Sequence, residues 1–175
     1  MKKKKILCFG DSITEGYMVS DENSWPYLLE ELSEGRVETI NQGVSGDTTL
    51  DGLHRLGHAL DTAPDIAIVE FGINDLFSMV PVEQAELNLS IITEKFKETG
   101  TEVILAGFSL HGSNRWDEMY ARVSEKHSAI LYPDIFNGLK YTDGGFNKKF
   151  FLPDGVHPNE HGYAIIAANM FRIIS

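Results

Sequence analysis

The order in which two kinds of apolar segment follow each other constrains the fold of this 175-residue chain most strongly. Short, nearly continuous apolar runs predict strands at 5–9, 37–40, 65–71, 102–107 and 129–132. Segments whose apolar residues recur every three or four positions predict helices at 24–35, 48–60, 81–99, 116–127 and 158–174. This alternation predicts an α/β fold with a five-stranded parallel sheet covered on both faces. No linker, repeat or low-complexity tract interrupts the sequence, so we expect one domain over 1–175.

Charge and composition exclude several classes of partner. The net charge of −11 disfavours binding to nucleic acid and to anionic membrane surfaces, and we interpret the basic run at 2–5 as a solvated flank. No apolar stretch approaches the roughly 20 residues of a membrane span, which predicts no stable membrane insertion. The apolar run after the lysines is too short for a signal peptide, so the sequence favours a cytoplasmic protein; a secreted protein whose signal has been removed is the alternative. Cys8 is the only cysteine and falls in a predicted strand, so we expect a buried thiol and no internal disulfide.

Polar, glycine-rich segments follow three of the predicted strands and precede the last helix. They are 10–16, 41–49, 72–75 and 154–158. Because ligands of open parallel sheets bind in the crevice outside the carboxyl ends of the strands, we expect these four segments to meet at one edge of the sheet.

Together the four segments contain the groups that acyl transfer requires. Ser12 supplies a hydroxyl nucleophile, which stays weak until a base removes its proton. Asp154 and His157 are three residues apart, a spacing that lets the carboxylate fix one imidazole nitrogen while the other faces a serine. The backbone N–H groups of Ser12 and Gly46 and the side-chain amide of Asn74 are suitable donors for an oxyanion.

Each of these residues also has a purely structural interpretation. Ser12 is a suitable cap for a following helix, Asn74 suits a turn, and Gly46 suits a tight turn. Asp154 and His157 suit a surface turn before a helix. Each structural interpretation stays open when its residue is considered alone. If all of them held, four polar segments would lie at the strand ends by coincidence.

In their order and spacing, the four segments resemble the four sequence blocks of the SGNH hydrolases, also called GDSL-type esterases and lipases. The tripeptide 10–12 is similar to the nucleophile block, Gly46 to the glycine block, 72–75 to the G-x-N-D block and 154–157 to the D-x-x-H block. Segment 43–49 and the leucine-rich stretch after it are most similar to the bacterial thioesterase/lysophospholipase/arylesterase branch.

This resemblance implies a flavodoxin-like three-layer α/β/α fold and a role for each site residue. Ser12 is the implied nucleophile, His157 the general base and acid, and Asp154 the residue that orients the imidazole. Ser12, Gly46 and Asn74 form the implied oxyanion hole. The implied activity is hydrolysis of small acyl esters or thioesters through an acyl-enzyme, with no metal and no cofactor.

The sequence departs from that branch next to the asparagine. Ile73 stands where the branch has a second glycine, and the apolar run 76–79 follows where a polar loop is usual. We consider Ile73, Phe77 and Met79 candidates for lining an acyl pocket, with a place in the core as the alternative.

Other motifs give weaker signals. His54 and His58 have the i, i+4 spacing of metal ligands but lack a third ligand, so we interpret them as a solvated helix face and predict no metal site. Ser45 and Ser109 also follow strands, but neither lies in G-x-S-x-G.

Two other functions stay open: a carbohydrate O-deacetylase using the same site, and a non-catalytic module that binds a small ligand. The esterase and the deacetylase need a base directed at a serine, whereas the binding module does not.

Overall fold

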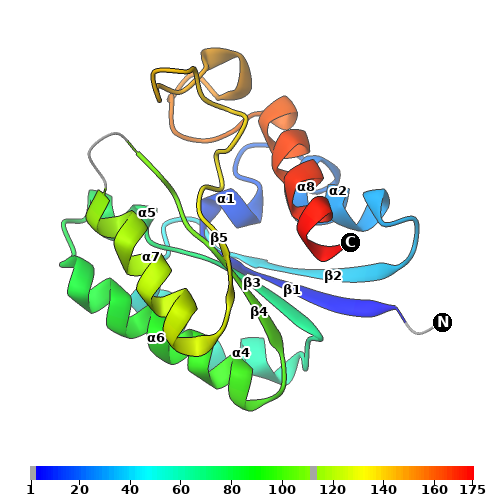
Figure 1. Ribbon diagram of the computed structural model, residues 1–175. Helices are drawn as coiled ribbons and strands as arrows, with labels where there is room; N and C mark the ends of the chain where they lie inside the picture. The colour runs from blue at the N-terminus through cyan, green and yellow to red at the C-terminus, as the bar shows by residue number, and fades with distance from the viewer. Residues whose placement is uncertain (1–2, 111–113) are drawn as a thin grey trace.

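The computed structural model describes residues 3–110 and 114–175 and contains a parallel sheet (Figure 1). Its strands are β1 (Lys4–Gly10), β2 (Val37–Gly43), β3 (Ile66–Glu70), β4 (Glu102–Ala106) and β5 (Ile130–Tyr132). They are ordered β2-β1-β3-β4-β5, and every neighbouring pair is parallel. The predicted five-stranded parallel sheet and its flavodoxin-like order are thereby confirmed.

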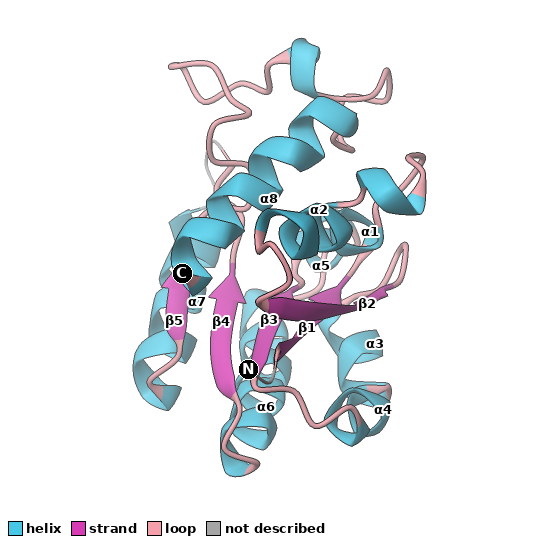
Figure 2. Ribbon diagram, turned by 90° about the vertical axis from the view of Figure 1, so that its right-hand side faces the viewer, coloured by secondary structure: helices cyan, strands magenta, loops and turns pink. Residues whose placement is uncertain are grey.

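Helices cover both faces of this sheet, as predicted (Figures 1 and 2). The long ones are α2 (Trp25–Leu32), α6 (Val82–Glu98), α7 (Asn114–His127) and α8 (Glu160–Ile174). Helices α2 and α8 pack together on one face, and α6 packs with α7 and with α3 (Thr49–His54) on the other. Because β1 lies between two helical layers, its residues Ile6 to Phe9 are fully buried, including the thiol of Cys8.

One predicted helix is divided in two. The segment 48–60 forms α3 and α4 (Leu56–Asp61), which are separated at Arg55. The Arg55 guanidinium donates to the carbonyl oxygens of Gly10 and Gln42, each at 2.8 Å, and Nε forms an ion pair with Asp47 at 2.6 Å. These contacts fix Arg55 outside helical geometry, and the leucine spacing of the segment could not reveal them.

Two helices begin later than predicted. Helix α2 begins at Trp25, and the hydroxyl of Ser24 before it donates to the carbonyl of Asp21 and makes no capping hydrogen bond to the helix. Helix α8 begins at Glu160, two residues after Pro158, because the Asn159 side chain accepts the N–H of Gly162 at 3.1 Å and so caps the helix.

Short helices and an irregular segment lie at the carboxyl edge of the sheet. They include α1 (Ser12–Glu15) after β1 and α5 (Ile73–Phe77) after β3. Two 3-10 turns, η1 (Asp21–Asn23) and η2 (Lys148–Phe150), complete the elements. A largely irregular connection over 133–152 links β5 to α8 and leads to the turn that carries Asp154 (Figure 1). Among the described residues, no helix is both long and apolar enough to cross a membrane.

Candidate active site

Ser12 is the first residue of α1, directly outside the carboxyl end of β1. The cap of this helix is Asp11, whose Oδ1 accepts the N–H of Ile13 at 2.9 Å. The interpretation of Ser12 as the helix cap is therefore wrong. Its hydroxyl instead lies 3.0 Å from Nε2 of His157, although the two residues are 145 positions apart in the sequence.

Asp154 holds the other side of the His157 ring. Its Oδ2 lies 2.8 Å from Nδ1 of His157, while Oδ1 accepts the backbone N–H groups of Val156 and His157 at 2.9 and 3.0 Å. Burial alone raises the pKa of the Asp154 carboxyl, but these hydrogen bonds outweigh it and hold the pKa below its ordinary value. A carboxylate that remains ionised fixes the imidazole so that Nε2 faces Ser12.

Tyr17 covers one face of the same imidazole. The two ring centroids are 4.3 Å apart and the ring planes are tilted by 38°. Tyr17 follows Gly16, whose φ of +89° turns the chain back at the end of α1. Sequence reasoning missed this residue, because a lone aromatic after a turn has no spacing that relates it to a histidine 140 positions later.

The three expected oxyanion donors are Ser12, Gly46 and Asn74. Within residues 3–110 and 114–175, the N–H groups of Ser12 and Gly46 have no protein acceptor. The Asn74 amide is engaged: Nδ2 donates to the carbonyl of Asp47 at 2.9 Å and to Oδ2 of Asp11 at 3.2 Å. Asn74 therefore reaches an oxyanion by sharing or releasing one of these two hydrogens.

The loop that carries Gly46 is held from several sides. The N–H of Val44 donates to the carbonyl of Gly10 at 3.0 Å. The buried carboxylate of Asp75 accepts the N–H and the hydroxyl of Thr49 at 2.8 and 2.6 Å. With the Arg55–Asp47 ion pair, these bonds fix the loop relative to the nucleophile. Asp75 belongs to the G-x-N-D segment, but its partner could not be identified from the sequence.

A pocket of about 250 Å³ opens beside the Ser12 hydroxyl. It is lined by Ser12, Ile13, Ile73, Asn74, Phe77, Asp154, Val156 and His157. Ile73 is buried and forms part of the wall, whereas Phe77 is 57% exposed at the rim. Met79 is 88% exposed and is not among the lining residues. Ile73 and Asn74 lie on α5.

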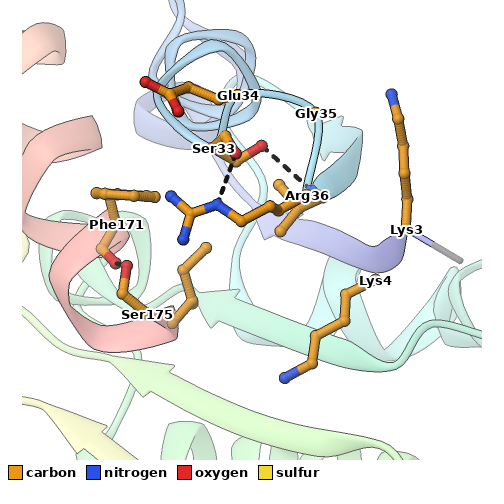
Figure 3. Close-up of a pocket in the computed structure, with 10 residues that line it drawn as sticks. Lys3, Lys4, Ser33, Glu34, Gly35, Arg36, Phe171 and Ser175 are labelled. Atoms are coloured by element: carbon orange, nitrogen blue, oxygen red, sulfur yellow. Dashed lines mark hydrogen bonds between the residues drawn. The ribbon is translucent and has the colours of Figure 1, made fainter. Parts of the chain in front are cut away.

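A larger hollow of about 490 Å³ lies elsewhere on the molecule, next to the amino-terminal ends of β1 and β2 (Figure 3). Its wall includes Lys3, Lys4, Arg36 and Phe171. The Arg36 guanidinium lies over the Phe171 ring, 5.2 Å from its centroid, and Nε donates to the carbonyl of Ser33 at 2.8 Å. No histidine lines this hollow, so it offers no imidazole to serve as a general base.

The parallel sheet and the arrangement at its carboxyl edge are those of an α/β/α serine hydrolase. The family described as GDSL-like Lipase/Acylhydrolase matches residues 8–165, and the chain belongs to this family of ester hydrolases.

Similar proteins are known by sequence and by structure. An arylesterase of Vibrio mimicus is 30% identical over 94% of this chain and 84% of its own length. The thioesterase 1/protease 1/lysophospholipase L1 of Escherichia coli K12 is 27% identical over 93% of this chain and 79% of its own. The crystal structure of TesA superposes with a TM-score of 0.90, at 25% identity, and covers 98% of both chains.

Proposed function

We propose that this ester hydrolase cleaves small carboxylic esters and thioesters, with Ser12, His157 and Asp154 as its catalytic residues. The observation that supports this assignment is the continuous series of contacts from the Ser12 hydroxyl through both nitrogens of His157 to the Asp154 carboxylate. A module that only binds a ligand has no need of an imidazole directed at a serine hydroxyl.

In the proposed reaction, Ser12 Oγ attacks the acyl carbon while Nε2 of His157 takes the hydroxyl proton. The carbonyl oxygen becomes an oxyanion that accepts hydrogen bonds from the N–H groups of Ser12 and Gly46 and from the Asn74 amide. His157 returns the proton to the leaving oxygen or sulfur, and the acyl group stays on Ser12. Water then attacks the acyl-enzyme with the same base, releases the acid and restores the hydroxyl.

The pocket supports a preference for short acyl groups. Its volume of about 250 Å³ is below the usual range of ligand pockets, which begins at about 300 Å³. Ile73, Phe77 and Val156 present apolar surface beside the nucleophile, which suits an aliphatic or aromatic group. The names of the relatives, an arylesterase and a thioesterase/lysophospholipase, are consistent with this proposal.

Covalent labelling tests the nucleophile. We expect a fluorophosphonate to add one adduct on Ser12, and we expect Ser12→Ala to lose labelling together with at least about 10³-fold in kcat on p-nitrophenyl acetate. Ser45→Ala is the matched control, because Ser45 also follows a strand but is exposed and lacks an imidazole partner. An intact Ser12→Ala protein that keeps full activity contradicts the assignment.

A substrate series tests the acyl preference. We expect kcat/KM to fall as the acyl group of p-nitrophenyl esters and acyl-CoA thioesters lengthens, and Phe77→Ala to change that order while Leu87→Ala, an equally exposed position on α6, does not. Faster turnover of acetylated sugars than of any of these esters identifies a carbohydrate O-deacetylase instead.

A further inference from the structure

Two buried carboxyl groups contact each other directly behind the nucleophile. Asp11 is 0% exposed and Glu70 is 4% exposed, and the two carboxyl groups are near enough to affect each other's ionisation. Glu70 is the last residue of β3 and is paired in register with Gly10 of β1, so the parallel sheet itself places it beside Asp11. The catalytic steps described above use neither carboxyl.

The space for this contact exists because residue 10 has no side chain. A Cβ atom at Gly10 would lie 2.2 Å from Oγ1 of Thr14 and 2.8 Å from Oε2 of Glu70, distances that no real side chain tolerates. Thr14 donates its hydroxyl to that same Glu70 oxygen at 2.8 Å. The Glu70 carboxyl therefore fills the position that a side chain at residue 10 would need.

Hydrogen bonds distinguish the two carboxyl groups. Asp11 accepts the N–H of Ile13 on Oδ1 and the amide of Asn74 on Oδ2, and both donors favour its ionised form. Glu70 accepts one side-chain donor, the Thr14 hydroxyl, on Oε2. Two carboxyl groups can be hydrogen-bonded only if one of them holds a proton.

The charges near the pair do not neutralise it. The carboxylates of Asp47 and Asp75 face Asp11 and add like charge. The Arg55 guanidinium, which donates to the carbonyl of Gly10, is bound to Asp47 and to backbone carbonyls. The buried hydroxyls of Tyr120 and Tyr163 lie close to the pair but donate to the carbonyls of Phe71 and Ser12. Burial raises the pKa of Asp11 to about 7 and raises that of Glu70 well above its usual range.

We propose that Asp11 and Glu70 share one proton, held by Glu70, and that the pair positions the oxyanion hole. The ionised Asp11 fixes the amide of Asn74 and, through the N–H of Ile13, the start of the helix that carries Ser12. Loss of the shared proton places two negative charges in contact and disturbs both donors. This inference rests on the proposed roles of Ser12 and Asn74.

Glu70→Gln provides the sharpest test, because an amide can donate to Asp11 and accept from Thr14 but cannot lose a proton to form a negative charge. We expect the wild-type kcat to fall on the alkaline side of neutral pH with little change in KM, as the shared proton leaves. We expect Glu70→Gln to keep at least about half of the neutral-pH kcat and to lose that alkaline fall. Glu34→Gln, on an exposed turn, should reproduce the wild-type profile.

Infrared spectroscopy tests the proton without relying on catalysis. We expect the wild-type protein at neutral pH to show the carbonyl stretch of a protonated carboxylic acid, which shifts in D₂O and is absent from Glu70→Gln. We also expect Asp11→Asn to lower kcat at least about 10-fold with a smaller change in KM, because Asn74 loses its charged acceptor.

The possible failures are distinguishable. A wild-type protein without fluorophosphonate labelling or ester turnover refutes the proposed function, and the infrared band still tests the proton. An active wild type whose alkaline fall is unchanged in Glu70→Gln overturns the positioning role. Absence of the carboxylic-acid band from the wild-type protein overturns the shared proton, whether or not the variants fold.

Discussion

The ring of Tyr17 lies against the only imidazole that contacts Ser12 among the described residues, and this contact makes Tyr17 a target for substitution. We expect Tyr17→Leu to lower kcat about 3- to 10-fold, because an aromatic ring contact contributes about 0.5–1.5 kcal/mol and here restrains the orientation of His157. Steady-state kinetics on p-nitrophenyl acetate measures the effect. Tyr17→Phe is the matched control and should stay near wild type; equal losses in both variants would assign the effect to the hydroxyl.

Arg55 is a second residue whose contacts predict a measurable change. Lysine cannot reproduce its hydrogen bonds to Gly10 and Gln42 together with the ion pair to Asp47. We expect Arg55→Lys to reduce the free energy of unfolding by about 1.5–3 kcal/mol and to lower kcat, because the glycine loop loses its tether. Urea unfolding and kinetics measure both effects. Arg115→Lys, at an exposed ion pair, should leave both unchanged.

Sequence reasoning identified the residues whose functional groups suit acyl transfer. It missed the residues whose importance depends only on their contacts in the folded protein. Ser12, Gly46, Asn74, Asp154 and His157 stood out because their groups are those that acyl transfer needs, and the structure brings them to one edge of the sheet. Tyr17, Arg55 and Glu70 carry no such mark. Glu70 in particular falls in a buried strand, where its contact with Asp11 depends on the register of β1 against β3.

At the scale of elements, the close approach of β1 and α1 predicts a strong effect at Gly10. We expect Gly10→Ala to cost at least about 2 kcal/mol of unfolding free energy, because the new methyl group overlaps Thr14 and Glu70 in a packed interior. Gly57→Ala on α4 is the matched control: nothing lies within 4 Å of its Cβ position, and a gain of about 0.5–1 kcal/mol is expected from helix propensity. Urea unfolding measures both variants, and equal stabilities would contradict the packing argument.

Helices and strands were predictable from the sequence where a single apolar pattern determined the secondary structure. The strand 65–71 and the helix 81–99 match β3 and α6 closely, because a continuous apolar run and a long three-to-four repeat leave little choice. The division between α3 and α4 was not predictable, since the leucine spacing continues through Arg55. Leu50 belongs to that spacing and is nevertheless 45% exposed.

For the whole molecule, the buried carboxyl groups predict how stability depends on pH. The pKa values of Asp11, Glu70, Asp75 and Asp117 are raised, chiefly by burial, so the folded protein keeps protons that the unfolded chain releases. The free energy of unfolding should therefore fall as the pH rises from about 4 through about 7. We expect a higher Tm at about pH 5.5 than at about pH 8.

Other groups act differently, which defines the control for this prediction. Burial lowers the pKa of His127, so this imidazole makes the free energy of unfolding rise with pH near its ordinary pKa, opposite to the effect of the carboxyl groups. Hydrogen bonds lower the pKa values of Asp51 and Glu86, so their stabilisation is lost only at more acid pH. Because Glu70→Gln removes one of the raised groups, its Tm should depend less on pH than that of the wild type. If calorimetry finds the same pH dependence of Tm in both proteins, the assignment of a raised pKa to Glu70 would be falsified.

The fold of the whole molecule was the most predictable level. Alternation of strands and helices determines a parallel sheet with two helical layers, and this architecture needs no knowledge of individual contacts. The strand order then places the first and third strands side by side, which is what brings Ser12 near Asn74. The distances within the site depend on side-chain packing and were beyond reach of the sequence pattern.

The burial of Cys8 makes this chain convenient for site-specific labelling. It is the only cysteine of the sequence, it is fully enclosed in β1, and burial raises the pKa of its thiol, so the reactive thiolate does not form at neutral pH. A maleimide dye should leave the wild-type protein unmodified and attach once to Met79→Cys, a highly exposed position shortly after α5. A fluorophore there would sit close to the rim residue Phe77 and report acylation by its emission, with no prior removal of native cysteines.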